Sequence, residues 1–160
     1  MSTTAVIINE IRTSLEPPVF AQLTNSANQT LVATVVSSVL SLPTTSVSAT
    51  SKRLTISPDT ITIAGPGLYR IAARCQVLTA VTGGVHSIDI VLNGITVATH
   101  SSTITAASSA FTLQAEYIAT LTSAFTTVKV NVTQPTLGSA IISGTTPSRA
   151  SLSVFGIIPQ

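Results

Sequence analysis

Two histidines and one aspartate are the residues of this chain that could most readily form a reactive site. His86 and Asp89 are three residues apart, and His100 follows the Asn93-Gly94 pair. If that pair turns a hairpin, both imidazoles lie at its open end and can approach each other across paired strands. A zinc site needs at least three protein ligands, and Asp89 is the only nearby acid. The two histidines could therefore belong to a metal site or be two polar residues at the rim of a sheet, and we favour the second interpretation.

Serine is abundant, so a Ser-His-Asp set could be drawn from His86 and Asp89. No Gly-x-Ser-x-Gly elbow is present to position a nucleophile. The five acids are spread from Glu10 to Glu116, which leaves no carboxylate pair for acid–base work. We therefore predict that the protein is not an enzyme, and that it has no catalytic residues, bound metal or cofactor.

The single cysteine, Cys75, is not predicted to be reactive either. Cys75 shares a predicted strand face with Ile71 and Ala73, and this placement predicts a buried, unreactive thiol. One cysteine excludes an internal disulfide and suits a protein made in a reducing cytoplasm.

An alternating pattern identifies the elements that carry these residues. After the turn residues 65–67, apolar and polar side chains alternate over residues 69–77, which is typical of a half-buried strand. Similar patterns predict strands over residues 111–119, 128–133 and 151–158. Asn93-Gly94 predicts a hairpin, and residues 53–63 resemble a strand, a Ser-Pro-Asp turn and a second strand.

Together these segments predict an all-β fold of eight to ten short antiparallel strands, arranged as a two-sheet sandwich or as a barrel. Residues 24–51 could add one or two outer strands. The predicted core residues are Tyr69, Ile71, Cys75, Ile88, Ile90, Leu92, Leu113 and Val130.

Composition argues against nucleic acid and membrane partners. Charged residues make up 8% of the 160 positions, and the only basic pair, Lys52-Arg53, suits a solvated loop. The apolar run at 31–42 is too short and too rich in Ser and Thr to cross a bilayer. The N-terminus lacks the charge and apolar pattern of a signal peptide, so we expect none.

Several segments together resemble a known family. They are GLYRI at 67–71, Asn93-Gly94, LQAEYIATL, VKVNV and the closing SLSVFGI, in that order. They resemble the globular domain of the complement C1q and tumour necrosis factor superfamily over residues 18–158. The resemblance implies that the strands form a two-sheet jelly-roll sandwich, of ten strands in the family, and that the protein is a tight homotrimer. Ser123-Ala124-Phe125 stands where the family usually has Gly-Asp, so no calcium-linked role is carried over.

The resemblance also places aromatic residues of the late strands near a three-fold axis. Tyr117 and Phe155 are the first candidates for the trimer interface, and Phe111 follows them. The alternative is that all three rings fill the core of one subunit.

Bacteriophages also use this trimeric jelly roll, and an unexported chain fits a virion protein that is assembled in the host cytoplasm. We therefore expect a trimeric capsid decoration or cement protein, whose partners are its own copies and a major capsid or other virion protein. The alternatives are a receptor- or glycan-binding tip of a phage fibre or spike, and a bacterial surface or spore-layer protein. The absence of Trp and of a shaft favours decoration over the fibre tip.

Residues 1–16 form a predicted N-terminal arm, separate from the jelly-roll domain at 17–160. Its apolar residues recur on one side of a helical pattern, although residues 6–8 could also add as a strand to a sheet edge. Pro17-Pro18 ends any helix. We expect the arm to dock either on its own trimer or on a capsid subunit through Ile7, Ile8, Ile11 and Leu15.

Overall fold

The computed structural model describes residues 19–31, 37–47, 53–79, 84–104, 110–122, 125–134, 140–145 and 149–159. The predicted arm with Ile7, Ile8, Ile11 and Leu15 lies outside these residues. Within them, no helix is both long and apolar enough to cross a membrane.

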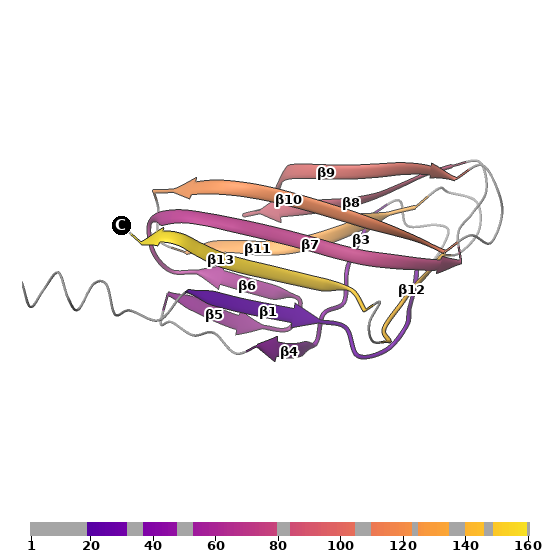
Figure 1. Ribbon diagram of the computed structural model, residues 1–160, viewed down its shortest axis with the longest axis horizontal. Helices are drawn as coiled ribbons and strands as arrows, with labels where there is room; N and C mark the ends of the chain where they lie inside the picture. Colours follow the sequence, from indigo (N-terminus) through magenta and orange to yellow (C-terminus); the bar gives the residue numbers. More distant parts are fainter. Residues whose placement is uncertain are drawn as a thin grey trace, which may run out of the picture.

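Two antiparallel sheets pack face to face and form the jelly-roll sandwich that the sequence predicts (Figure 1). We call the seven-stranded one the large sheet. Its strands are β1 (Phe20–Thr24), β2 (Gln29–Leu31), β4 (Thr44–Val47), β7 (Gly67–Thr79), β10 (Phe111–Leu121), β12 (Ala140–Ile142) and β13 (Ser151–Pro159).

The six-stranded one is the small sheet. It contains β3 (Ser37–Val39), β5 (Leu54–Ser57), β6 (Thr60–Ile63), β8 (Gly84–Leu92), β9 (Ile95–Ile104) and β11 (Thr126–Thr133). The described strands outnumber the eight to ten expected because the stretch 24–51 contributes three short strands and because β12 has no clear alternating pattern.

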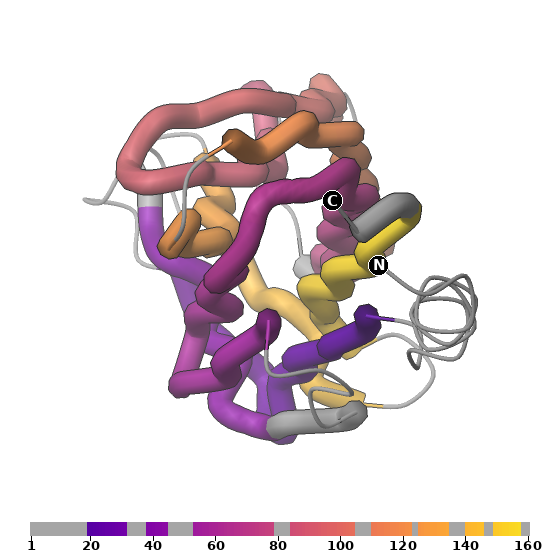
Figure 2. Tube along the Cα trace, turned by 90° about the vertical axis from the view of Figure 1, so that its left-hand side faces the viewer, coloured from indigo at the N-terminus to yellow at the C-terminus, as the bar shows by residue number. Residues whose placement is uncertain are grey.

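The long strand β7 organises the large sheet. It pairs with β10 along one edge and with β13 and then β12 along the other. β1 pairs with the outer edge of β13, so the first and last described strands lie side by side (Figure 2). The C-terminal segment is therefore a strand paired on both sides, which confirms the strand predicted over residues 151–158.

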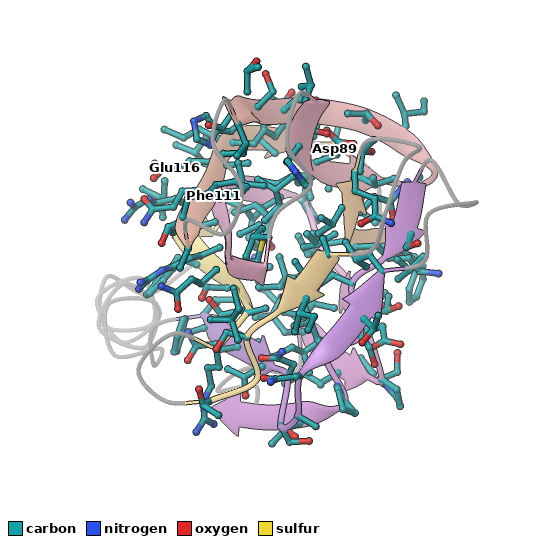
Figure 3. The ribbon with its side chains drawn as sticks, turned by 90° about the vertical axis from the view of Figure 1, so that its right-hand side faces the viewer. Asp89, Phe111 and Glu116 are labelled. Carbon is teal, nitrogen blue, oxygen red and sulfur yellow. The ribbon has the colours of Figure 1, made fainter. Side chains whose placement is uncertain are left out.

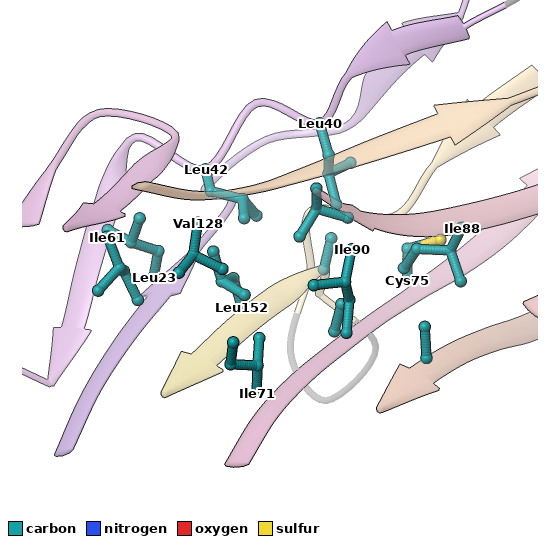
Figure 4. Close-up of a cluster of buried hydrophobic side chains, with 14 of the residues drawn as sticks. Leu23, Leu40, Leu42, Ile61, Ile71, Cys75, Ile88, Ile90, Val128 and Leu152 are labelled. Carbon is teal, nitrogen blue, oxygen red and sulfur yellow. The ribbon is translucent and has the colours of Figure 1, made fainter. Parts of the chain in front are cut away.

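The core lies between the inward faces of the two sheets (Figure 4). All eight predicted core residues are buried, and none exposes more than 9% of its surface. Ile71 and Cys75 come from the large sheet and meet Ile88, Ile90 and their neighbours from the small sheet. Burial of these apolar side chains is the main force that holds the sheets together.

Two tight turns adopt the left-handed backbone conformation that their residues favour. Asn93 (φ 48°) and Gly94 (φ 84°) close the β8–β9 hairpin, which confirms the hairpin prediction. Asp59 (φ 60°) follows Pro58 in the β5–β6 turn, and its carboxylate accepts a hydrogen bond from the Leu42 amide. Short polar side chains tolerate this conformation better than large ones.

Candidate functional site

His86 lies in the core and not at a rim, so the rim prediction is wrong for this residue. It is fully buried on the inward face of β8, two residues before Ile88. Its ring packs edge-on against Phe111 of β10, with ring centroids 5.3 Å apart. Sequence alternation places position 86 on the same face as Ile88 and Ile90, and that signal outweighs the polarity of the side chain.

His100 has a structural contact at the edge of the sandwich. It is exposed on β9, and its Nδ1 accepts a hydrogen bond from the backbone N–H of Gln114 at 3.2 Å. Because β9 and β10 belong to different sheets, this bond joins the two sheets at their neighbouring edges.

Asp89 does not join the histidines. It lies three residues after His86, hence on the opposite face of β8, and it accepts a hydrogen bond from the Thr99 hydroxyl at 2.7 Å. Figure 3 places it apart from Phe111 and Glu116 of β10. Among the described residues, no group of three or more His, Cys, Asp or Glu side chains could hold a metal ion.

Cys75 is buried on the inward face of β7, as predicted. Burial raises the pKa of its thiol from 9.0 to about 12, because the thiolate would lose its hydration there. The thiol therefore stays protonated and packs as a small apolar side chain.

The outward face of the large sheet is the most distinctive surface of the described chain. The paired strands β10, β7, β13 and β1 align Ile118, Arg70, Phe155 and Phe20 in one row across it. Ile118 is 57% exposed and Phe155 is 40% exposed. The rings of Phe20 and Phe155 stack with centroids 4.2 Å apart. We use the name outward face for this solvent-facing side of β10, β7, β13 and β1, and apolar row for Ile118, Phe155 and Phe20 on it.

A two-point ion pair crosses the outward face. Arg70 Nη2 lies 2.7 Å from Glu116 Oε2, and Nε donates to Oε1 at 2.8 Å. The hydrogen bond from Arg70 and its positive charge lower the pKa of the Glu116 carboxyl. Both side chains are about half exposed, 50% and 48% respectively, so the pair fixes geometry more than it stabilises the fold.

Next to this pair, the outward face is hollowed into a groove of about 360 Å³. The small side chain of Ala72 leaves room at its centre, and Arg74, Gln114 and Ser151 border it. Arg74 is exposed. No described residue forms a hydrogen bond or an ion pair with its guanidinium.

The three aromatic candidates for a trimer interface occupy different faces. Phe155 lies on the outward face. Tyr117 and Phe111 lie on the inward side of β10 and pack, partly buried, against the core, a placement that favours the core alternative for these two. Sequence reasoning did not single out Ile118 or Arg74 as functional, although Ile118 is the one large apolar residue on the polar side of its strand.

Two further exposed apolar residues lie beside neighbouring turns at one end of the small sheet. Phe125 (71% exposed) precedes β11, and Ile95 (70% exposed) begins β9. Asn93 connects the β8–β9 turn to the start of β11. Its Oδ1 accepts hydrogen bonds from the Thr127 amide at 2.8 Å and from the Thr127 hydroxyl at 3.1 Å. We call Phe125 and Ile95 the apolar tip.

The sequence matches no protein-family model and no curated protein. The structure, by contrast, resembles crystal structures of murine APRIL, a jelly-roll protein of the tumour necrosis factor family. Those solved at pH 5.0, 8.0 and 8.5 superpose with TM-scores of 0.65, 0.63 and 0.60 at 11%, 10% and 10% sequence identity. Each similarity covers 88% of this chain and 100% of the other.

At such low identity the similarity shows the fold and nothing about activity. It agrees with the two-sheet topology and with the resemblance of the sequence segments. The fold of this protein is therefore a tumour necrosis factor-like jelly roll.

Proposed function

We propose that this protein is a homotrimeric structural protein, and that it decorates the capsid of a bacteriophage. In this proposal the outward face of the large sheet is buried between subunits, and the apolar tip contacts the capsid. The protein acts by binding, with no chemical step.

The observation that carries the proposal is the apolar row on the outward face. Ile118, Phe155 and the nearby Ile157 are each at least 40% exposed, and Phe20 adds a stacked ring. Clustered large apolar side chains on one face are typical of an interaction surface, because water solvates them poorly. Three-fold assembly is what the resemblance to the C1q and tumour necrosis factor superfamily implies.

A structural role in a virion fits the remaining observations. The one cysteine is reduced and buried, as suits a protein assembled in a cytoplasm. The chain contains no Trp, a residue that often stacks on sugars, and this favours a capsid over a glycan as the partner. The alternative, a receptor-binding tip of a phage fibre, would use the same apolar tip.

The oligomeric state is the first test. Light scattering on a size-exclusion column should give the mass of three chains at micromolar concentration. A monomer mass there would contradict the proposal at its base.

The second test separates the partners. The trimer should co-sediment with purified phage capsids that lack it, and Phe125→Ser should weaken this binding while the trimer stays intact. Binding to host cell envelopes in place of capsids would support the fibre alternative.

A further inference from the structure

We propose that the groove on the outward face binds a small oxyanion through the guanidinium of Arg74, and that this anion strengthens the association of subunits. The ligand is a carboxylate or a phosphate, because both present the oxygen acceptors that a guanidinium recognises. The inference rests on the proposed self-association and names the counter-ion that the interface requires.

The charges that border the groove do not balance. They come from two cations, Arg70 and Arg74, and one acid, Glu116. Arg70 and Glu116 neutralise each other in their two-point ion pair, whereas no described residue pairs with Arg74. One positive charge is therefore in excess on each subunit. When two such faces are buried together, the excess charges repel each other, and a buried guanidinium requires a counter-ion.

The polar groups beside Arg74 can donate hydrogen bonds. Strand pairing places Gln114 of β10 and Ser151 of β13 directly opposite Arg74 on its two sides, where Cβ atoms are about 5 Å apart. Ser153 borders the same groove. Its Oγ accepts a hydrogen bond from Gln22 Nε2 at 3.1 Å, which leaves its O–H able to donate. A ligand that uses all these groups supplies acceptors, and carboxylate and phosphate oxygens are acceptors.

The groove also has the room and the geometry for such a ligand. Ala72 lies between Arg70 and Arg74 along β7, and its small side chain leaves space in a groove of about 360 Å³. On the same face, the two carboxylate oxygens of Glu116 accept from one guanidinium at 2.7 and 2.8 Å. Arg74, four residues further along β7, can hold a second carboxylate or a phosphate in the same two-point manner.

An anion at Arg74 makes the outward face easier to bury. The apolar row beside the groove supplies surface that water solvates poorly. The unpaired guanidinium opposes burial of that surface, because it would lose its hydration without gaining a partner. A bound oxyanion removes this opposition.

The test compares association in three salts of equal ionic strength. Sedimentation velocity over a dilution series is run in sodium chloride, sodium acetate and sodium phosphate at neutral pH. Acetate or phosphate should tighten association about tenfold relative to chloride, because a charge-assisted contact replaces a repulsive one. An effect of acetate alone assigns a carboxylate, an effect of phosphate alone assigns a phosphate, and an effect of both assigns the oxyanion chemistry that they share.

Arg74→Gln separates a bound anion from a general effect of the salts. This variant loses the charge at an exposed position, so its association should be the same in all three salts. The matched control is Lys129→Gln, which removes an exposed charge from the small sheet and should keep the anion dependence. Equal association of the unmodified protein in all three salts, or an anion effect that survives in Arg74→Gln, would overturn the inference.

A second measurement detects the anion without relying on association. Acetate or phosphate is titrated into isotope-labelled protein and followed by NMR. The Arg74 Nε–H and the Gln114 side-chain amide should shift, whereas the amide of Asn131, on the small sheet, should not. Oligomers without these shifts overturn the anion site and leave self-association standing. A monomer in every salt removes the proposed function; shifts at Arg74 and Gln114 then keep the anion site, and their absence removes that as well.

Discussion

The inward and outward faces of β10 belong to one strand but differ in how well a single subunit explains them. On the inward face, Leu113 is fully buried and Ala119 nearly so, and both contact other residues of the core. On the outward face, Ile118 is 57% exposed although it is as apolar as Leu113. The subunit buries the apolar residues of the inward face itself, whereas it leaves Ile118 on the outward face exposed to solvent.

The same contrast holds for the charged groups. Arg70 has its ion-pair partner, Glu116, within one subunit. Arg74 lies four residues further along β7, and its guanidinium has no such partner among the described residues. A surface that mixes unsatisfied apolar and charged groups has the features of an interface.

The largest expected effect concerns the inward face of β7. Cys75 has a pKa of about 12 against an ordinary value of 9.0, so its native thiolate fraction near pH 8 should be about a thousandfold lower than that of a free thiol. A thiol reagent should therefore label it only after unfolding in urea. Rapid labelling of the native protein would show that this face is open to solvent.

The shifted thiol also predicts a direction with pH. Because the pKa is raised in the folded state, the folded protein holds its proton more tightly than the unfolded chain. This contribution to stability is complete below about pH 9 and is lost as the pH rises toward 12. In the wild-type protein the free energy of unfolding should therefore fall as the pH rises through this range. In Cys75→Ala it should fall less steeply with pH, as urea unfolding at several pH values would measure.

The next effect compares the two faces directly. Leu113→Ala should lower the free energy of unfolding by roughly 2–5 kcal/mol, because it leaves a cavity in a packed core. Ile118→Ala, on the same strand, should change the stability of one subunit by less than about 0.5 kcal/mol. Urea unfolding at a concentration where all proteins share one oligomeric state measures both. Equal losses would mean that Ile118 is part of the core.

A smaller effect is expected for association. If the outward face is the interface of the proposed trimer, Phe155→Ser, which removes a ring from it, should weaken association about tenfold or more, as for central aromatic residues of interfaces. Phe125→Ser is the matched control, since Phe125 is more exposed but lies at the apolar tip. Sedimentation velocity over a dilution series gives the comparison. A trimer that is equally stable in both variants would exclude the outward face as the interface.

These two faces also explain how much the sequence could reveal. A period of two assigns each residue of β7 and β10 to a face, so Tyr69, Ile71 and Leu113 could be placed in the core without coordinates. The all-β class followed from the same pattern, whereas the jelly-roll arrangement followed from the resemblance of several segments to a known family. The outward face could not be predicted as a functional site, because the exposure of Ile118 depends on which strands flank its own. Those pairing partners are distant in sequence and leave no local signal.

Buried polar groups were hidden for a related reason. Asn25 lies in a polar stretch but is only 2% exposed, because its side chain donates to the Ser143 carbonyl and accepts from the Ala150 amide. Those partners come from more than 100 residues away along the chain. His86 differs, because its alternation with Ile88 and Ile90 does indicate the buried face, although the polarity of its side chain suggests the rim.

The smallest expected effect concerns the apolar tip, which belongs to neither face of the large sheet. Phe125 has a φ of 66°, a left-handed conformation that costs a bulky residue about 1 kcal/mol or more. Phe125→Gly removes this strain but adds flexibility to the unfolded chain, so it should stabilise the fold by roughly 0.5–1 kcal/mol. The shift in urea midpoint measures it, with Phe125→Ala as the control that loses the ring but keeps the strain. If glycine stabilises the fold while capsid binding falls, a strained aromatic residue is held at the tip for contact with a partner. A fold that is no more stable with glycine than with alanine would show that the turn is not strained, and the tip would lose its strongest sign of function.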